Sequence, residues 1–349
     1  FVLLNHKQRS DRFGAELLPA LPEEQKWLLN YGGFLPYDRS SVILKVIPSP
    51  TVSWDGGGDG MSWSDPLNWN NDTVPAAGAD VLLPELSDSY SVGFEDELTL
   101  SSLTMERKAQ LWIRGTLTCI GEVNLAGEST LSCATGEFHA NGPFTVFEQG
   151  SLSIAQPFTF YQNDFMHLQQ SAYVSNAGNL HILGTTRVDS DKLTLAGVVI
   201  LEGTLEGHGQ PFLREAILSG SGTLNFTQPG YLRLIPYPGT SATISGNLTN
   251  KGIINGGGFD DLKWENGTLT NEGEWIFDGS TDISMVPLSG NNLFINKGLV
   301  RANNSSRTIE IPFVNRGGIV QTGSGSIIYT TSLVNEQQGT FSGHGILDV

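Results

Sequence analysis

The chain of 349 residues is poor in positive charge and in long apolar runs. Its 19 lysines and arginines stand against 36 aspartates and glutamates, which gives a formal net charge of −17. Nucleic acids and anionic membrane surfaces both require basic patches, so we expect neither as a partner. No run of about 18 apolar residues occurs, and the sequence therefore predicts no membrane insertion.

Motifs for common cofactor and catalytic chemistry are also missing. The histidines show no HExxH or other zinc-ligand spacing. No G-x-S-x-G segment and no phosphate-binding GxxxxGK[ST] segment occurs. We therefore expect no cofactor, no metal ligand and no catalytic residue.

Glycine, in contrast, is abundant at 42 residues, and it accompanies many serines, threonines and asparagines. The glycines follow no G-X-Y period, which excludes collagen. Apolar residues make up 39% of the chain, enough to form a core. This composition is typical of many short strands joined by tight turns.

A repeated apolar-x-Asn-x-Gly phrase gives the clearest signal. It reads LTNKG, LTNEG, FINKG and FVNRG, followed by a degraded LVNEQ, and VSNAG (174–178) is an outlying copy. The asparagines of the first five copies are Asn250, Asn271, Asn296, Asn315 and Asn335. Each of them lies roughly 20 residues after the one before it. The segments between them alternate apolar and polar residues with the period of two that indicates strands.

A period of about 20 residues made of strands and glycine turns predicts an all-β protein with a parallel β-helix, or β-solenoid, over residues 85–349. Coils would stack about 4.8 Å apart, in roughly 13 turns. We expect the five asparagines to form a hydrogen-bonded ladder at turns. We expect the glycine two positions later to supply a positive φ.

Two flanking segments differ from the repeats. Residues 1–48 are less periodic and contain one helix candidate, PEEQKWLLN (22–30). Residues 49–84 form a Trp/Gly/Pro-rich linker and solenoid cap with Trp54, Trp63 and Trp69. Capping is needed because an open β-helix end is an unpaired sheet edge. An exposed sugar-stacking platform is the alternative for the three tryptophans.

The tryptophan-rich opening, the VPAAGADVLLP segment (74–84) and the coils that follow resemble units of filamentous-haemagglutinin-like and autotransporter-adhesin-like surface proteins. Residues 1–48 resemble the closing segment of a preceding unit, and the start at Phe1 predicts excision from a longer precursor. The resemblance implies a right-handed parallel β-helix and an extracellular or cell-surface location. It also implies a structural role as stalk, fibre or adhesin, with neighbouring units, self-assembly and glycans as partners.

An enzyme is the alternative function, because parallel β-helices also bind or degrade polysaccharides. Glycoside hydrolysis needs two carboxylates in one groove. The candidate clusters are Asp260 with Asp261, Glu95 with Asp96 and Glu97, and Asp189 with Asp191. Solvated turns are the competing interpretation, and neighbouring strand residues such as Asp260 and Asp261 point to opposite faces.

Two cysteines follow matching phrases, LTC and LSC, at Cys119 and Cys133. If these strands stack in adjacent coils, the cysteines lie within disulfide range. A pair of buried free thiols is the alternative, because cysteine packs well as a small hydrophobe.

Other motifs carry weaker expectations. WDGGGDG (54–60) places Asp55 and Asp59 near a turn, where calcium is an alternative to a solvated loop. His208 and His344 lie in GHG phrases, in a turn position that serine also occupies elsewhere. Glycosylation by a eukaryotic host would use the sequons at Asn71, Asn225, Asn247, Asn266, Asn303 and Asn304.

Overall fold

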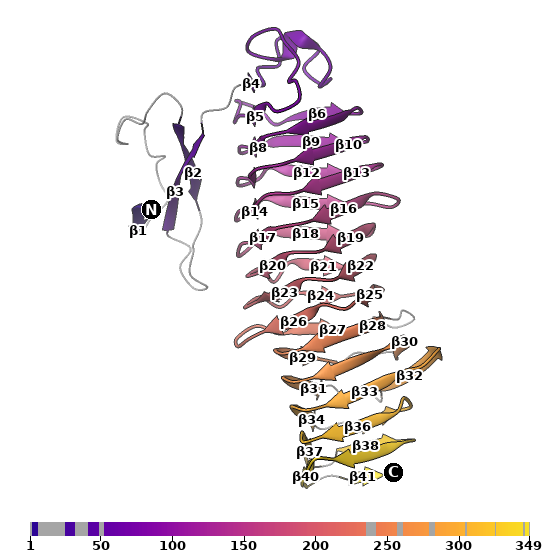
Figure 1. The fold of residues 1–349 in the computed structure, drawn as a ribbon. Coiled ribbons are helices and arrows are strands. Elements are labelled where there is room, and N and C mark those ends of the chain that lie inside the picture. Colours follow the sequence, from indigo (N-terminus) through magenta and orange to yellow (C-terminus); the bar gives the residue numbers. More distant parts are fainter. Residues whose placement is uncertain are drawn as a thin grey trace. The chain divides into compact units, whose positions relative to one another are not determined.

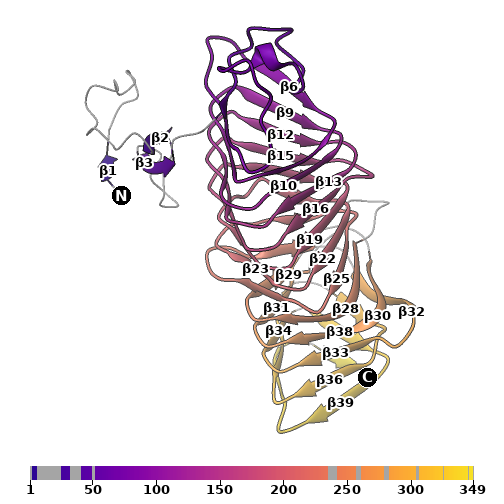
Figure 2. The ribbon, with the colours of Figure 1, turned by 45° about the horizontal axis from the view of Figure 1, so that its top comes forward.

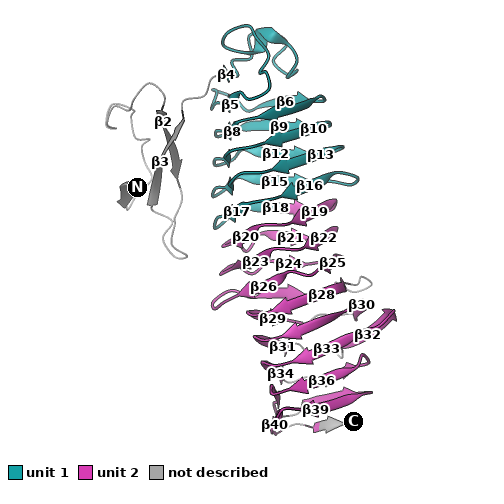
Figure 3. Cartoon of the chain, in the orientation of Figure 1, with its two compact units in different colours: residues 1–174 teal, residues 175–349 magenta. Residues whose placement is uncertain are grey.

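The computed structural model is all-β, with parallel sheets stacked as a β-solenoid of about 12 turns (Figure 1). It describes residues 2–5, 25–31, 41–48, 52–234, 242–256, 261–278, 283–303, 306–324, 326–344 and 346–348. Contacts divide the chain into two compact units, residues 1–174 and 175–349 (Figure 3). The described residues contain no α-helix, and none of their helical segments could cross a membrane.

Near the N-terminus, three strands form an antiparallel sheet in the order β1-β3-β2. They are β1 (Val2–Asn5), β2 (Gln25–Tyr31) and β3 (Ser41–Pro48). The helix predicted over 22–30 is wrong, because its described part is β2. Residues Gln25 to Tyr31 pair with the strand-forming residues of β3, so sheet pairing overrides the local helix propensity.

From residue 80 onward, each coil of the first unit contributes one short strand to each of three faces, which we call faces 1, 2 and 3 (Figure 2). Face 1 contains β6 (Tyr90–Phe94), β9 (Ala109–Ile113), β12 (Thr130–Cys133) and β15 (Ser151–Ile154). Face 2 contains β7 (Glu97–Leu100), β10 (Thr116–Cys119), β13 (Glu137–Ala140) and β16 (Thr159–Gln162). Face 3 contains β4 (Val52–Ser53), β5 (Asp80–Leu83), β8 (Ser102–Met105), β11 (Val123–Leu125), β14 (Phe144–Val146) and β17 (Phe165–Leu168). The parallel stack therefore already includes β4 and β5, ahead of residue 85.

The second unit repeats the three-face plan, and β18 (Tyr173–Asn176) spans the boundary. Its face 1 contains β21 (Leu193–Leu195), β24 (Phe212–Leu213), β27 (Leu232–Leu234), β29 (Ile253–Asn255), β31 (Glu274–Asp278), β34 (Leu299–Asn303), β37 (Ile319–Thr322) and β40 (Thr340–Gly343). Face 2 contains β19 (Asn179–Ile182), β22 (Val198–Leu201), β25 (Ile217–Gly220), β32 (Ile283–Ser289), β35 (Ser306–Ile309), β38 (Ile327–Thr330) and β41 (Ile346–Asp348). Face 3 contains β20 (Thr185–Val188), β23 (Thr204–Gly207), β26 (Thr223–Phe226), β33 (Leu293–Asn296), β36 (Phe313–Arg316) and β39 (Leu333–Glu336). Two long strands, β28 (Ala242–Asn250) and β30 (Leu262–Asn271), run through both faces 2 and 3.

The core of each unit lies inside the coils, because alternate strand residues point inward. In β13, Phe138 and Ala140 are buried, whereas Glu137 and His139 are only partly covered. Stacked coils place like residues on each other, so the rings of Phe138 and Phe160 lie parallel with centroids 5.1 Å apart. Such columns remove apolar surface from water in every coil, and this is the main source of stability.

The corner between faces 3 and 1 of the first unit contains one left-handed residue in each of four successive coils. The φ angles are 68°, 55°, 66° and 68° at Lys108, Glu128, Gln149 and Ser171. None of these residues is glycine, so their residue types did not reveal the corner. Each turn is closed by a backbone hydrogen bond three residues back, for example from Ser129 N to Ala126 O at 3.1 Å.

Candidate functional site

The predicted asparagine ladder is confirmed in the second unit. Each Nδ2 donates to the Oδ1 of the next asparagine, at 2.7, 2.8, 2.9 and 3.0 Å along Asn250, Asn271, Asn296, Asn315 and Asn335. The first four side chains are fully buried, and the last is exposed. Nδ2 of Asn271 also donates to the Leu299 carbonyl at 3.1 Å. The ladder therefore satisfies buried amides while it joins consecutive coils.

The expected role of the glycine after each asparagine needs correction. Gly252, Gly273 and Gly298 do not have positive φ, whereas Gly317 does, at 72°. A Cβ on Gly273 would collide with the backbone of the preceding coil, lying 2.7 Å from Lys251 C and 2.8 Å from Gly252 N. At three of the four glycines, the phrase thus requires glycine because the coils approach closely, not because the backbone bends into the left-handed region.

The three tryptophans form a cap, as predicted. Trp54, Trp63 and Trp69 are 1%, 2% and 0% exposed, which excludes a sugar-stacking platform built from them. The Trp69 ring makes edge contacts with the other two, at centroid distances of 5.0 and 4.8 Å. Trp63 N donates to Gly93 O and Gly93 N to Met61 O, so this segment pairs with the edge of β6. Trp63 also packs on Phe94 of β6, with centroids 5.2 Å apart.

The aspartates of the cap loop accept hydrogen bonds from the loop itself. Asp59 Oδ1 accepts from Met61 N, Ser62 N and Asn68 Nδ2, each at 2.8 Å. Asp55 Oδ1 accepts from Gly57 N at 3.0 Å. Across the described ranges, no group of three or more His, Cys, Asp or Glu residues is placed to hold a metal ion. The carboxylates therefore stabilise the loop by the hydrogen bonds of Asx turns.

We expect the cap to weaken in acid. Backbone hydrogen bonds from Ser62 and Met61, followed by the Asn68 amide, lower the pKa of Asp59. A lowered folded-state pKa contributes stability above the usual value of about 4, and this contribution is lost as the pH falls through the folded-state pKa. Tryptophan fluorescence should report a loosening of the cap below about pH 4.

Asp59→Ala should remove this acid-dependent step, whereas the exposed Asp96→Ala should leave it intact. An unchanged acid profile in Asp59→Ala would assign the step to other carboxylates.

The cysteines do not occupy stacked positions, so the register on which the predicted disulfide depended is wrong. Cys119 lies on face 2, stacked between Leu100 and Ala140, and Cys133 lies on face 1 beside Ile113. Stacked residues are separated by a whole coil, whereas the stretch from Cys119 to Cys133 is shorter than one coil. The second cysteine therefore falls on another face. Both thiols are free and buried.

We expect both thiols to be unreactive in the folded protein. Burial raises the pKa of Cys119 and of Cys133, and the thiolate is the reactive form. A thiol reagent at pH 8 should label the chain only in denaturant, where it should find both cysteines without prior reduction. Recovery of both thiols only after reduction would show that a disulfide forms after all.

Three of the candidate aspartates accept hydrogen bonds from neighbouring groups. Asp261 Oδ1 accepts from Ser284 N at 3.1 Å, and Asp260 lies outside the described residues. Asp189 Oδ2 accepts from Arg187 Nε at 3.0 Å, and Asp191 Oδ1 accepts from Gln210 N at 2.8 Å.

Glu95 and Asp96 lie in the exposed turn before β7, whose first residue is Glu97, and Glu95 pairs with Arg114 at 3.2 Å. Exposed pairs of this kind contribute little to stability.

The two GHG phrases lie at different corners of the coil. His208 follows β23 on face 3, whereas His344 follows β40 on face 1. The prediction that the two histidines occupy the same turn position is therefore wrong.

Asn71, Asn247 and Asn266 of the sequons are exposed, and Asn225 and Asn303 are partly exposed. Asn304 lies outside the described residues. The structure thus leaves at least three sequons accessible to a glycosylating host.

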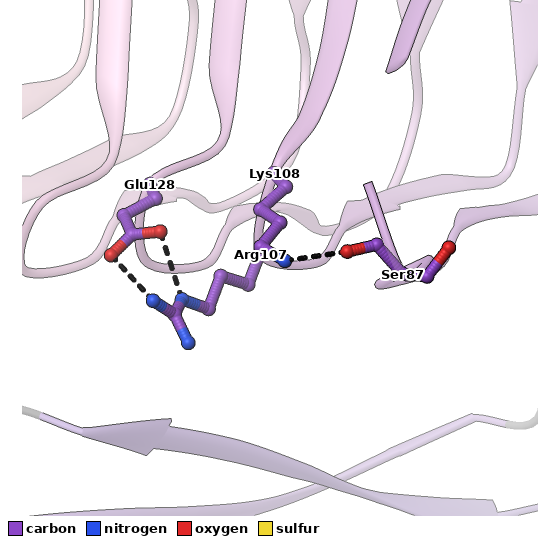
Figure 4. Close-up of polar contacts among 4 residues, drawn as sticks. All are labelled: Ser87, Arg107, Lys108 and Glu128. Atoms are coloured by element: carbon purple, nitrogen blue, oxygen red, sulfur yellow. Dashed lines mark hydrogen bonds and ion pairs between the residues drawn. The ribbon is translucent and has the colours of Figure 1, made fainter. Parts of the chain in front are cut away.

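Two adjacent cations at a corner of the first unit are also engaged locally (Figure 4). Arg107 makes a two-point contact with Glu128, at 2.9 Å from Nε and 2.7 Å from Nη2. Lys108 Nζ donates to Ser87 O at 2.8 Å. Glu128 neutralises Arg107, so this pair joins two coils and does not form an anion site. The two side chains are 41% and 43% exposed, so the pair adds little stability.

Among the described residues, a polar hollow in the second unit offers a candidate ligand site. It has a volume of about 600 Å³ and spans β34, β37 and β40 of face 1. Its lining consists of Arg301, Asn303, Gln321, Thr322, Gly323, Ser342, Gly343 and His344. The sequence did not indicate this hollow, because its lining residues come from three different coils. The GHG phrase had drawn attention to His344 alone. No protein-family model, curated protein or solved structure matches this chain.

The β-solenoid architecture is consistent with a β-helix repeat protein.

Proposed function

We propose that this chain is a structural segment of a long extracellular surface protein, acting as a stalk, fibre or adhesin and lacking catalytic activity. The asparagine ladder carries the proposal. Four consecutive side-chain hydrogen bonds, together with the parallel backbone pairing, hold adjacent coils at a fixed spacing. A stack in which each coil contacts its neighbours resists bending and carries load along its axis.

Two further observations support this role. The tryptophan cap pairs with the first coils and so protects a sheet edge that would otherwise aggregate. The motifs that resemble adhesin-type units support placement at the cell surface, with neighbouring units of the same polypeptide as partners.

A surface location can be tested on intact cells of the source organism. Antibodies raised against the purified chain should label unpermeabilised cells, and external protease should remove the label. Labelling that requires permeabilised cells would contradict the proposal.

Mechanical function can be tested by pulling the chain with optical tweezers. Coils of about 20 residues should unravel in steps of roughly 65 Å, since each residue extends by about 3.3 Å. Extension at low force without steps would contradict a load-bearing role.

The enzymatic alternative predicts cleavage of polysaccharides by the purified chain. New reducing ends or unsaturated sugars that disappear in Asp261→Ala, Glu97→Ala or Asp191→Ala would replace the structural proposal with a catalytic one.

A further inference from the structure

The hollow of face 1 presents a cation on an acidic chain. Arg301 is its one arginine or lysine, and no aspartate or glutamate is among its lining residues. The other lining side chains include amides, hydroxyls and an imidazole, from Asn303, Gln321, Ser342 and His344. These groups donate and accept hydrogen bonds to neutral hydroxyls.

Arg301 keeps hydrogen-bonding capacity. Its Nη2 lies 3.2 Å from Glu274 Oε1, and its Nε is buried, so a ligand would use the exposed part of the guanidinium. The side chain is still 38% exposed. A single pairing with Glu274 leaves donors of the guanidinium for a second oxyanion, and a planar carboxylate matches their geometry.

The lining residues are arranged in a row along the stack. Arg301, Gln321 and Ser342 occupy the same register position in β34, β37 and β40. Adjacent positions are about 4.8 Å apart, which is close to the length of one pyranose ring. A linear saccharide lying along the row would therefore present one sugar to each coil.

We propose that this hollow binds an acidic oligosaccharide, with the carboxylate of one uronic acid at Arg301 and hydroxyls of neighbouring sugars at Gln321 and Ser342. The site is additional to the structural role and does not depend on it. Arg301 is the one cation among the lining residues, so it matches the carboxylate of one sugar.

Isothermal titration with trigalacturonate tests the proposal, with a neutral trisaccharide and inorganic sulfate as comparison ligands. We expect trigalacturonate to bind with a dissociation constant of about 1 mM or tighter. The neutral trisaccharide and sulfate should bind at least tenfold more weakly. Equal binding of sulfate would reveal a simple anion site, and equal binding of the neutral sugar would remove the role of the carboxylate; either result overturns the proposal.

Variants identify the site. Arg301→Ala should weaken trigalacturonate binding at least tenfold, and Arg301→Lys should weaken it less because the charge remains. Arg316→Ala is the matched control: it breaks a comparable pair with Glu336, at 2.8 Å, outside the hollow, and should leave binding unchanged.

Gln321→Trp fills the hollow from an exposed position and keeps the Arg301–Glu274 pair, so it tests the site if Arg301→Ala is unstable. Full affinity in a folded Gln321→Trp or Arg301→Ala protein, or failure of the wild type to bind trigalacturonate, would refute the assignment.

Discussion

Asn271→Ala is expected to destabilise the second unit by about 3 kcal/mol. The substitution removes the acceptor of Asn250 Nδ2 and the donors to Asn296 Oδ1 and the Leu299 carbonyl. Each buried polar group left without a partner costs about 1–3 kcal/mol. Asn250 Nδ2 keeps its second contact, to Glu274 O at 3.2 Å, which limits the total.

Urea unfolding followed by circular dichroism measures the loss, and hydrogen exchange locates it. Exchange should accelerate at the coils that contain Asn250, Asn271 and Asn296, because a solenoid responds to its nearest neighbours. Asn335→Ala is the matched control. Asn335 is an exposed member of the ladder, so water can replace it as the acceptor of Asn315 Nδ2, and its loss should cost about 1 kcal/mol or less. Equal effects at the two positions would show that burial of the ladder contributes little.

The ladder could be predicted from the sequence because spacing alone places the asparagines in register. Their separations of 21, 25, 19 and 20 residues equal whole coils, even though the coils differ in length. The differences in coil length fall in the segments between the strands, so Asn250 and Asn271 still stack in register. Composition likewise predicted short strands and tight turns, and the tryptophan spacing predicted the cap.

The corners could not be predicted, because their residue types are not diagnostic. Lys108 and Gln149 adopt left-handed φ although neither is a glycine, and both residue types are common in other conformations. The positions of Cys119 and Cys133 also required the coil length of the first unit, whereas the asparagine phrases reveal the period of the second unit. The disulfide prediction equated matching phrases with matching faces, but similar phrases recur on different faces of one coil.

The candidate site shows the same limit. Arg301, Gln321 and Ser342 are unremarkable in the sequence, and they converge only when three coils are stacked in the correct register. The sequence also did not indicate that Trp112, unlike the cap tryptophans, is exposed. It is 44% exposed on face 1, where its register neighbours are Gly93 and Ser132, whereas the conspicuous cap tryptophans are buried.

Gly273→Ala should destabilise the second unit by about 3 kcal/mol, although alanine fits the local backbone. Its Cβ would enter the backbone of the preceding coil, near Lys251 and Gly252, and backbone atoms cannot move aside as a flexible side chain can. The neighbouring coils must then separate, which also stretches the ladder contact between Asn250 and Asn271. Urea unfolding of the variant measures the cost.

Gly317 provides the matched comparison. It occupies the same position of the repeated phrase, but it needs glycine for its positive φ and not for the close approach of a neighbouring coil. Its φ is 72°, and a Cβ there would lie 3.4 Å from Gln337 O, an ordinary contact. Gly317→Ala should cost about 1–2 kcal/mol of backbone strain. Gly317→Asn should cost less, because asparagine tolerates left-handed backbone, whereas Gly273→Asn should be at least as damaging as Gly273→Ala. If asparagine rescued position 273 and not position 317, the close approach of coils would not be the reason why glycine recurs in the phrase.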